Sequence, residues 1–184
     1  MTERRIKAVG TVVGANLGRC YRDMNGDTDG VIKALEAVGQ QRTAEARGTE
    51  ALITNWIPKN QEEREKAGIT DIDIREAVDY YTTSRGQHPC SPNLLKYTSL
   101  GSVLAFDAFN LVDKLLTQPL QIIVGEVQGV FGSYKDGHEL YNRAASKKKH
   151  LYIVKGVSHY DLYDKPEPVS KAVKQLEAFY KENL

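Results

Sequence analysis

Three short apolar runs that each end in glycine constrain the fold of this chain most strongly. They are "IKAVGTVVG" at 6–14, "LQIIVG" at 120–125 and "LYIVKG" at 151–156. Strands buried on both faces of a parallel sheet read as continuous apolar runs rather than as alternations. A terminal glycine suits a sharp exit from the strand. We therefore predict an α/β fold with three parallel strands near 6–14, 120–125 and 150–155.

The segments around the last two runs have a helical periodicity. Between them, "SYKDGHELYNRAASKKKH" carries a helical apolar stripe, so 120–156 is predicted to form a strand–helix–strand unit. After the third run, "PEPVSKAVKQLEAFYKENL" presents one apolar helical face and predicts a helix near 166–182 that packs on the sheet. Asp164 is placed to cap this helix, and prolines 166 and 168 suit its first turn.

The long segment between the first two strands reads as helical. "VIKALEAVGQQRTAEAR" at 31–47 and "DIREAVDYYTTSR" at 73–85 are amphipathic, whereas "SLGSVLAFDAFNLVDKLL" at 99–116 is apolar almost all round and predicts one buried helix. We interpret the chain as a single α/β domain, residues 1–184, with a helical lid inserted at about 20–116.

Composition excludes several classes of protein. The net charge is +1 with interspersed signs, which does not suit a nucleic-acid-binding surface. No run approaches the roughly 18 apolar residues of a membrane span. The two cysteines, Cys20 and Cys90, lack the spacing of a zinc site or a disulfide framework, and His88 and His138 have no partner at metal-ligand spacing. We expect a cytoplasmic protein with no metal and no cofactor.

Four stretches resemble one known family. "FDAF", "TQPLQIIVG", "YNRAASKKKHLYIVKGVSHYDLYD" and "LEAFYKENL" are similar to the C-terminal part of α/β-hydrolases, in the dienelactone-hydrolase-like subfamily that includes the fungal polyketide transferases. The resemblance implies a partial α/β-hydrolase fold and the hydrolysis or transfer of acyl groups from small esters or thioesters. It also implies that the nucleophile elbow precedes the strand at 6–14 and that the N-terminal half of the sheet is absent.

The candidate catalytic base is His159, in "GVSHY" just beyond the third strand. A histidine there lies at the active-site edge of such sheets, although capping of the turn is the structural alternative. The resemblance places the triad acid after 120–125, but Gly129 stands where we expect an aspartate. Glu126 is the nearest carboxylate and becomes the predicted acid, with a solvated loop residue as the alternative. Asp136 is a weaker candidate.

The nucleophile is missing from this pattern. A nucleophile elbow needs the sequence G-x-S-x-G, which does not occur in these 184 residues. Ser158 in "GVSHY" has Tyr160 in place of the second glycine, and Cys20 and Cys90 lack the glycine framing. With no elbow and no oxyanion hole, the chain is predicted to be inactive alone.

Residues of the insertion are candidates for substrate contacts. Asp107, a carboxylate inside an apolar stretch, and the neighbouring Phe106 and Phe109 are the predicted substrate-binding residues. A structural hydrogen bond for Asp107 and plain core packing for the aromatics remain the alternatives. A further set could line an acyl pocket: Trp56, Tyr80 and Tyr81.

Three accounts of the chain therefore stay open: part of a hydrolase, one half of a split enzyme completed by an N-terminal partner, or a non-catalytic interaction module. All three leave the strand at 6–14 with an apolar edge in need of a neighbour. We expect self-association or an N-terminal partner at this edge.

Overall fold

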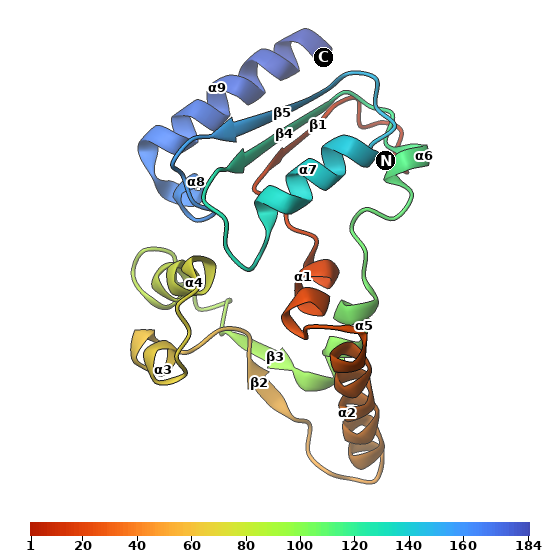
Figure 1. Ribbon diagram of the computed structural model, residues 1–184, viewed down its shortest axis with the longest axis vertical. Coiled ribbons are helices and arrows are strands. Elements are labelled where there is room, and N and C mark those ends of the chain that lie inside the picture. Colours follow the sequence, from red (N-terminus) through yellow and green to blue (C-terminus); the bar gives the residue numbers. More distant parts are fainter. The chain divides into compact units, whose positions relative to one another are not determined.

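The computed structural model describes all 184 residues, and the chain divides into two compact units (Figure 1). One unit combines Met1–Asn16 with Phe109–Leu184, and the other is Leu17–Ala108. The second unit is thus inserted into the first, between its first and second strands.

The first unit holds a three-stranded parallel sheet in the order β1-β4-β5. Its elements are β1 (Val9–Val12), α6 (Val112–Leu115), β4 (Leu120–Gly125), α7 (Ser133–Arg143), β5 (Lys149–Val154), α8 (Asp161–Asp164) and α9 (Pro166–Asn183). The predicted parallel α/β architecture is confirmed. The first strand is shorter than predicted because Ile6 forms a turn with Glu3 and Val13 has a φ of 42°.

The central strand β4 is buried along its whole length, as its continuous apolar sequence predicts. Helices α7 and α9 lie on opposite faces of the sheet (Figure 1). Gly137 of α7 lies so close to Val124 that a Cβ on this glycine would approach the valine Cγ1 to 2.6 Å. On the other face, Ile123 and Val154 belong to a core cluster with Ala172 of α9. The period of two in the strand therefore divides its side chains between the two helices.

The terminal helix α9 matches the predicted range, but its start differs. Its N-cap is Lys165, and no side chain caps it, so the prediction that Asp164 is the cap is wrong. Lys165 continues in extended backbone up to Pro166, the first helical residue. A proline at this position needs no capping partner for its own nitrogen, since it has no N–H.

The second unit is mostly helical. Its elements are α1 (Leu17–Met24), α2 (Thr28–Ala46), β2 (Ile53–Asn55), α3 (Gln61–Lys66), α4 (Ile72–Thr82), β3 (Leu94–Lys96), a 3-10 turn (Tyr97–Ser99) and α5 (Leu100–Ala105). Helices α2 and α4 fall on the two predicted amphipathic segments. The short antiparallel pair of β2 and β3 was not predicted, because three-residue strands carry too little periodicity to detect.

The apolar segment 99–116 does not form the single buried helix that its composition predicts. It contains α5 and α6, and Phe106 between them has extended backbone and is 50% exposed. The Arg22 guanidinium donates to the carbonyl oxygens of Leu104 (2.7 Å) and Phe106 (2.9 Å). These bonds satisfy carbonyls that the end of a helix leaves without partners, so the helix stops there.

No helix of the structure combines the length and the apolar character needed to cross a membrane.

Candidate functional site

The loop between β5 and α8 holds His159 and is fastened to the loop after β4. Gly156 has a φ of 67°, a conformation that favours glycine, and its N–H donates to the Glu126 carboxylate at 2.8 Å. The Val127 N–H donates to the Val157 carbonyl at 3.0 Å. The two loops that leave the carboxyl ends of adjacent strands are therefore joined, which fixes the position of the residues that follow.

The turn that carries His159 is closed by its own side chains. The Ser158 N–H donates to Asp161 Oδ2 and the Asp161 N–H donates to Ser158 Oγ, both at 3.1 Å. Asp161 also pairs with Lys165 Nζ at 2.5 Å. Burial opposes ionisation of Asp161, but the bonds from Lys165 and Ser158 prevail and lower the pKa of its carboxyl. The reciprocal pair resembles a capping box and holds the backbone on both sides of His159.

Both ring nitrogens of His159 bond to hydroxyl groups. Nδ1 lies 3.1 Å from Ser133 Oγ, and Nε2 lies 3.0 Å from the Tyr163 hydroxyl. The residue is 5% exposed, and the ring of Phe131 stands edge-on to the imidazole at 5.9 Å. A hydroxyl can donate or accept, so either neutral tautomer of the imidazole is satisfied.

Ser133 reaches His159 because of where α7 begins. Gly132 takes a left-handed conformation with a φ of 69°, and Ser133 is the first residue of the helix that follows. Ser133 is itself buried, at 7% exposure. On the side of the strands, Gly125 allows a close approach, since a Cβ there would lie 2.3 Å from the Val157 carbonyl oxygen.

Burial sets the protonation state of His159. Desolvation of the charged form lowers the pKa of the imidazole to about 4. The ring is therefore neutral near pH 7, and one of its nitrogens can accept a proton. A hydroxyl on Nδ1 orients the ring, but it does not offset a positive charge on it as a carboxylate would.

The predicted acids do not bond to the histidine ring. The Glu126 carboxylate accepts from the Gly156 N–H, so it fastens the histidine loop instead. Asp136 lies inside α7, fully buried, and accepts the Asn16 N–H at 2.7 Å. The structure thus brings Glu126 to the His159 loop without a contact to the imidazole, and the role of Glu126 as acid stays a prediction.

Of the three side chains considered as nucleophiles, two are buried and one is exposed. Ser158 Oγ accepts the Asp161 N–H within the turn. Cys20 is buried in α1 near Met24, and Cys90 is exposed; both are free thiols.

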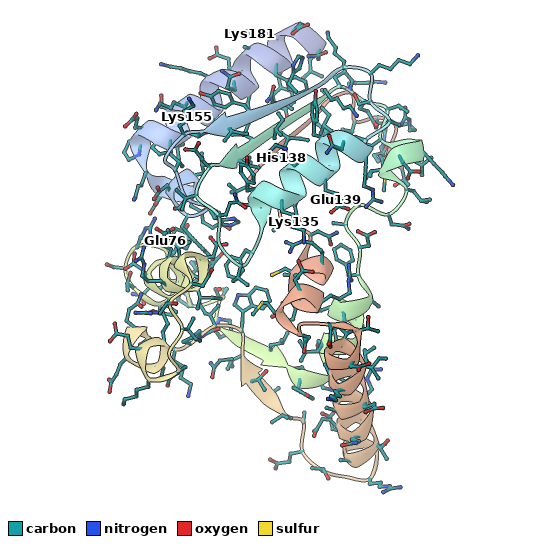
Figure 2. The ribbon with its side chains drawn as sticks, viewed as in Figure 1. Glu76, Lys135, His138, Glu139, Lys155 and Lys181 are labelled. Atoms are coloured by element: carbon teal, nitrogen blue, oxygen red, sulfur yellow. The ribbon has the colours of Figure 1, made fainter.

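The predicted substrate residues fall in different units. Phe106 and Asp107 belong to the inserted unit, whereas Phe109 belongs to the sheet unit and is buried there, with its carbonyl bonded to Arg143 at 3.0 Å. Their role in binding remains a prediction. No group of three or more His, Cys, Asp or Glu side chains is arranged to hold a metal ion. His138 lies on α7 (Figure 2), where its ring packs against Tyr134.

Two residues of the site were not anticipated from the sequence. Tyr163 stands four residues after His159, which is the spacing of neighbours on one helical turn, and this signal was available. Ser133 stands at the start of a predicted helix, but a serine there reads as a cap. Only the three-dimensional arrangement shows that its hydroxyl meets a histidine 26 positions later.

No family model matches the chain. YcjY of Escherichia coli K12, an uncharacterized protein, is 33% identical over 185 residues, which cover 99% of this chain and 58% of YcjY. PA2218 of Pseudomonas aeruginosa is 29% identical over 191 residues, which cover 99% of this chain and 47% of PA2218. The chain thus spans about half the length of the curated relatives it matches.

Solved structures share the fold. A crystal structure of PA2218 superimposes with a TM-score of 0.82 and 26% identity, over 99% of this chain and 55% of that one. DcsB in complex with a substrate analogue gives 0.70, over 99% and 59%, and the α/β hydrolase GrgF from Penicillium sp. sh18 gives 0.67, over 98% and 57%, both at 16% identity. The chain therefore has part of the α/β-hydrolase fold.

Proposed function

We propose that this chain is the histidine-bearing portion of an α/β-hydrolase that acts on ester or thioester substrates, by hydrolysis or acyl transfer. Within that fold we assign it to the dienelactone-hydrolase-like proteins related to polyketide transferases, with the chain corresponding to their C-terminal part. His159 is the general base. The site of the reaction is cytoplasmic, in keeping with two free thiols in the chain.

One observation carries the proposal: the buried, neutral His159 on the loop after β5. Ligands of open α/β sheets bind beyond the carboxyl ends of the strands, where this loop lies. The Ser133 hydroxyl on Nδ1 and the edge-on ring of Phe131 orient the imidazole, and a nucleophile would take the place of the Tyr163 hydroxyl on Nε2. A fixed neutral imidazole accepts a proton from a nucleophile and returns it to the leaving group.

Ser133 takes the place of the orienting group on Nδ1. In a triad this nitrogen donates to a carboxylate, which also stabilises the imidazolium. Ser133 supplies the orientation without the charge, and Gly129 stands where the resemblance leads us to expect the aspartate. Ser133 is thus a positioning residue, and His159 is a weaker base than a histidine with an ionised partner. Glu126 remains the predicted acid in any arrangement that brings its carboxylate to Nδ1.

The nucleophile and oxyanion hole are proposed to come from a segment or polypeptide that lies beside β1. These 184 residues contain no G-x-S-x-G elbow. β1 is an edge strand in this sheet, and its outer edge is the surface that such a segment would pair with. In its absence, we expect the chain to self-associate through this edge.

Turnover assays test this function. The purified chain is assayed with p-nitrophenyl esters and acyl thioesters, alone and after co-expression with the part of YcjY that this chain does not match. We expect almost no turnover alone, since the loss of a single oxyanion donor already costs about 10²–10³-fold. Activity that appears only in the co-expressed pair, and that His159→Ala abolishes, supports the proposal. Robust turnover by the chain alone refutes the missing nucleophile.

The orientation of His159 can be tested without any activity. We expect Ser133→Asp to raise the pKa of His159, because a carboxylate beside Nδ1 stabilises the charged ring. Ser133→Ala removes the hydroxyl, adds no charge and serves as the control. The ring resonances, titrated by NMR, report the pKa in each variant. An unchanged pKa in Ser133→Asp contradicts the contact between Ser133 and Nδ1.

A second candidate function is a non-catalytic interaction module. The observation that favours it is the Tyr163 hydroxyl on Nε2, which occupies the nitrogen that a nucleophile needs. This function predicts that the co-expressed pair forms a stable complex with no turnover. Gel filtration of the pair, together with the ester assay, distinguishes the two functions.

A further inference from the structure

The inserted unit carries two adjoining pockets between the β2–β3 pair and the loop that precedes β3. One has a volume of about 710 Å³ and the other about 380 Å³. They share one wall, formed by Tyr81, Ser91, Pro92, Asn93 and Leu94. Sites for small molecules have volumes of about 300–1,000 Å³. Each pocket falls within this range, and because they share five lining residues we treat them together as the β2–β3 groove.

The shared wall is fastened to β2 by Asn93. This residue has a φ of 53°, a left-handed conformation that asparagine tolerates better than most side chains. Its Oδ1 accepts the Ile57 N–H and its Nδ2 donates to the Ile57 carbonyl, both at 2.9 Å. The Asn93 carbonyl in turn accepts from Asn55 Nδ2 at 3.0 Å. These bonds hold the loop against the strand, so the groove exists before any ligand binds.

The larger pocket differs from the smaller one in its charge: Lys59 lines it, no carboxylate does, and the smaller pocket has neither a lysine nor an arginine. Lys59 is among its lining residues, and the Lys59 ammonium makes no ion pair in the structure. The nearby Glu63 accepts the Lys59 backbone N–H and belongs to the start of α3. His88 also lines this pocket, and its Nδ1 accepts the Cys90 N–H at 3.1 Å. The proton of the neutral imidazole is therefore on Nε2, which makes that nitrogen a donor.

The smaller pocket is mainly apolar. Trp56, Ile57 and Leu95 line it together with the shared wall. Leu94 of that wall is 58% exposed and Trp56 is 37% exposed, both large fractions for such side chains. Covering them with an apolar group removes their surface from water, which is favourable.

We propose that the β2–β3 groove binds an amphiphilic anion: a carboxylate with a single hydrocarbon chain. The carboxylate pairs with the Lys59 ammonium and accepts from His88 Nε2, and the chain lies along Trp56 and Leu94. A cation without a partner at one end and exposed apolar side chains at the other match the two ends of such a molecule. The site goes beyond the proposed function and does not rest on it.

The chain contains a single tryptophan, Trp56, which reports binding directly. Decanoate, kept below its micelle concentration, is titrated into the full chain while the tryptophan fluorescence is followed. We expect a saturable change. Decanol, with the same chain length and no charge, is expected to bind more weakly.

Lys59→Gln tests the charged end of the groove. Lys59 is exposed and ion pairs of exposed side chains are weak, so we expect about two- to fivefold weaker decanoate binding and unchanged decanol binding. Lys66→Gln is the matched control, because Lys66 is an exposed lysine of the same unit that pairs with Glu62 and lies outside both pockets.

Three results would overturn the proposal: no saturable fluorescence change, decanoate affinity that Lys59→Gln leaves unaltered, or an equal loss in Lys66→Gln, which would indicate general charge attraction. The assay requires no turnover. Its outcome is thus separate from the test of His159.

Discussion

A methyl group added at Gly125 tests how closely the end of β4 approaches the histidine loop. A Cβ at this position would lie 2.3 Å from the Val157 carbonyl oxygen and 2.8 Å from that of Ser158. Both contacts are with backbone, which cannot rotate away as the end of a side chain can. Gly125→Ala therefore has to push the loop of His159 away from the strand by about 1 Å, the shortfall from ordinary van der Waals contact.

The cost can be estimated from the contacts involved. Overpacking of this kind costs typically about 1–3 kcal/mol. The displacement also strains two backbone hydrogen bonds that flank Gly125, from Glu126 N–H to the Val154 carbonyl (3.1 Å) and from Val127 N–H to the Val157 carbonyl (3.0 Å). Each contributes about 1 kcal/mol. We expect Gly125→Ala to lower the free energy of unfolding by about 3 kcal/mol or more.

The assay is urea denaturation followed by circular dichroism, with Gly39→Ala as the matched control. Gly39 lies inside α2, and a Cβ there would meet no atom within 4 Å. Alanine is favoured over glycine in a helix interior by about 1 kcal/mol, so this variant is expected to be more stable than the parent. Equal stabilities for the two variants would refute the close approach at Gly125.

Three further predictions concern single side chains. The free energy of unfolding is expected to rise between pH 4 and 6.5, because in this range the unfolded chain binds a proton at His159 and the folded chain, where the His159 pKa is about 4, does not. The rise is up to about 3 kcal/mol. Denaturation at several pH values measures it, and His159→Gln is expected to reduce it. Asp27→Ala removes the side chain that accepts the Gly30 N–H at the start of α2 and is expected to cost about 1 kcal/mol in the same denaturation assay, with Asp27→Asn as the variant that keeps the cap. His138→Phe removes a buried Nε2 that has no hydrogen-bond partner and keeps a ring against Tyr134. Thermal denaturation of this variant is therefore expected to show unchanged or slightly higher stability. A loss of stability above about 1 kcal/mol would contradict this.

Much of the sheet unit was predictable because its signals are local and periodic. The run "LQIIVG" is apolar because β4 is buried on both faces, and the stripe of the last helix reflects its packing on the sheet. The single helix predicted at 99–116 failed for a reason outside that segment. Arg22, more than eighty positions earlier, bonds to the carbonyls where α5 ends.

The site was predictable only in part. His159 could be found because it follows a strand and a tight turn. Its contact with Ser133 could not, because Ser133 and Glu126 both lie in the segment that follows β4, and their order along the sequence does not reveal which of them meets the ring. In the structure the Ser133 hydroxyl bonds to the imidazole, and the Glu126 carboxylate accepts a hydrogen bond from the Gly156 N–H.

The insertion of one unit between β1 and β4 has a consequence for folding kinetics. Val9 pairs with Leu120, more than a hundred positions away, whereas β4 and β5 are joined through α7 by a short crossover. Closure of a long loop costs entropy before its contacts form, so pairs distant in sequence form slowly. During synthesis β1 leaves the ribosome before β4, and the two strands can pair only after the whole of 17–108 has followed. The edge of β1 that faces β4 is thus unpaired during this interval in the nascent chain, and this is the stage at which we expect chaperones to be needed most.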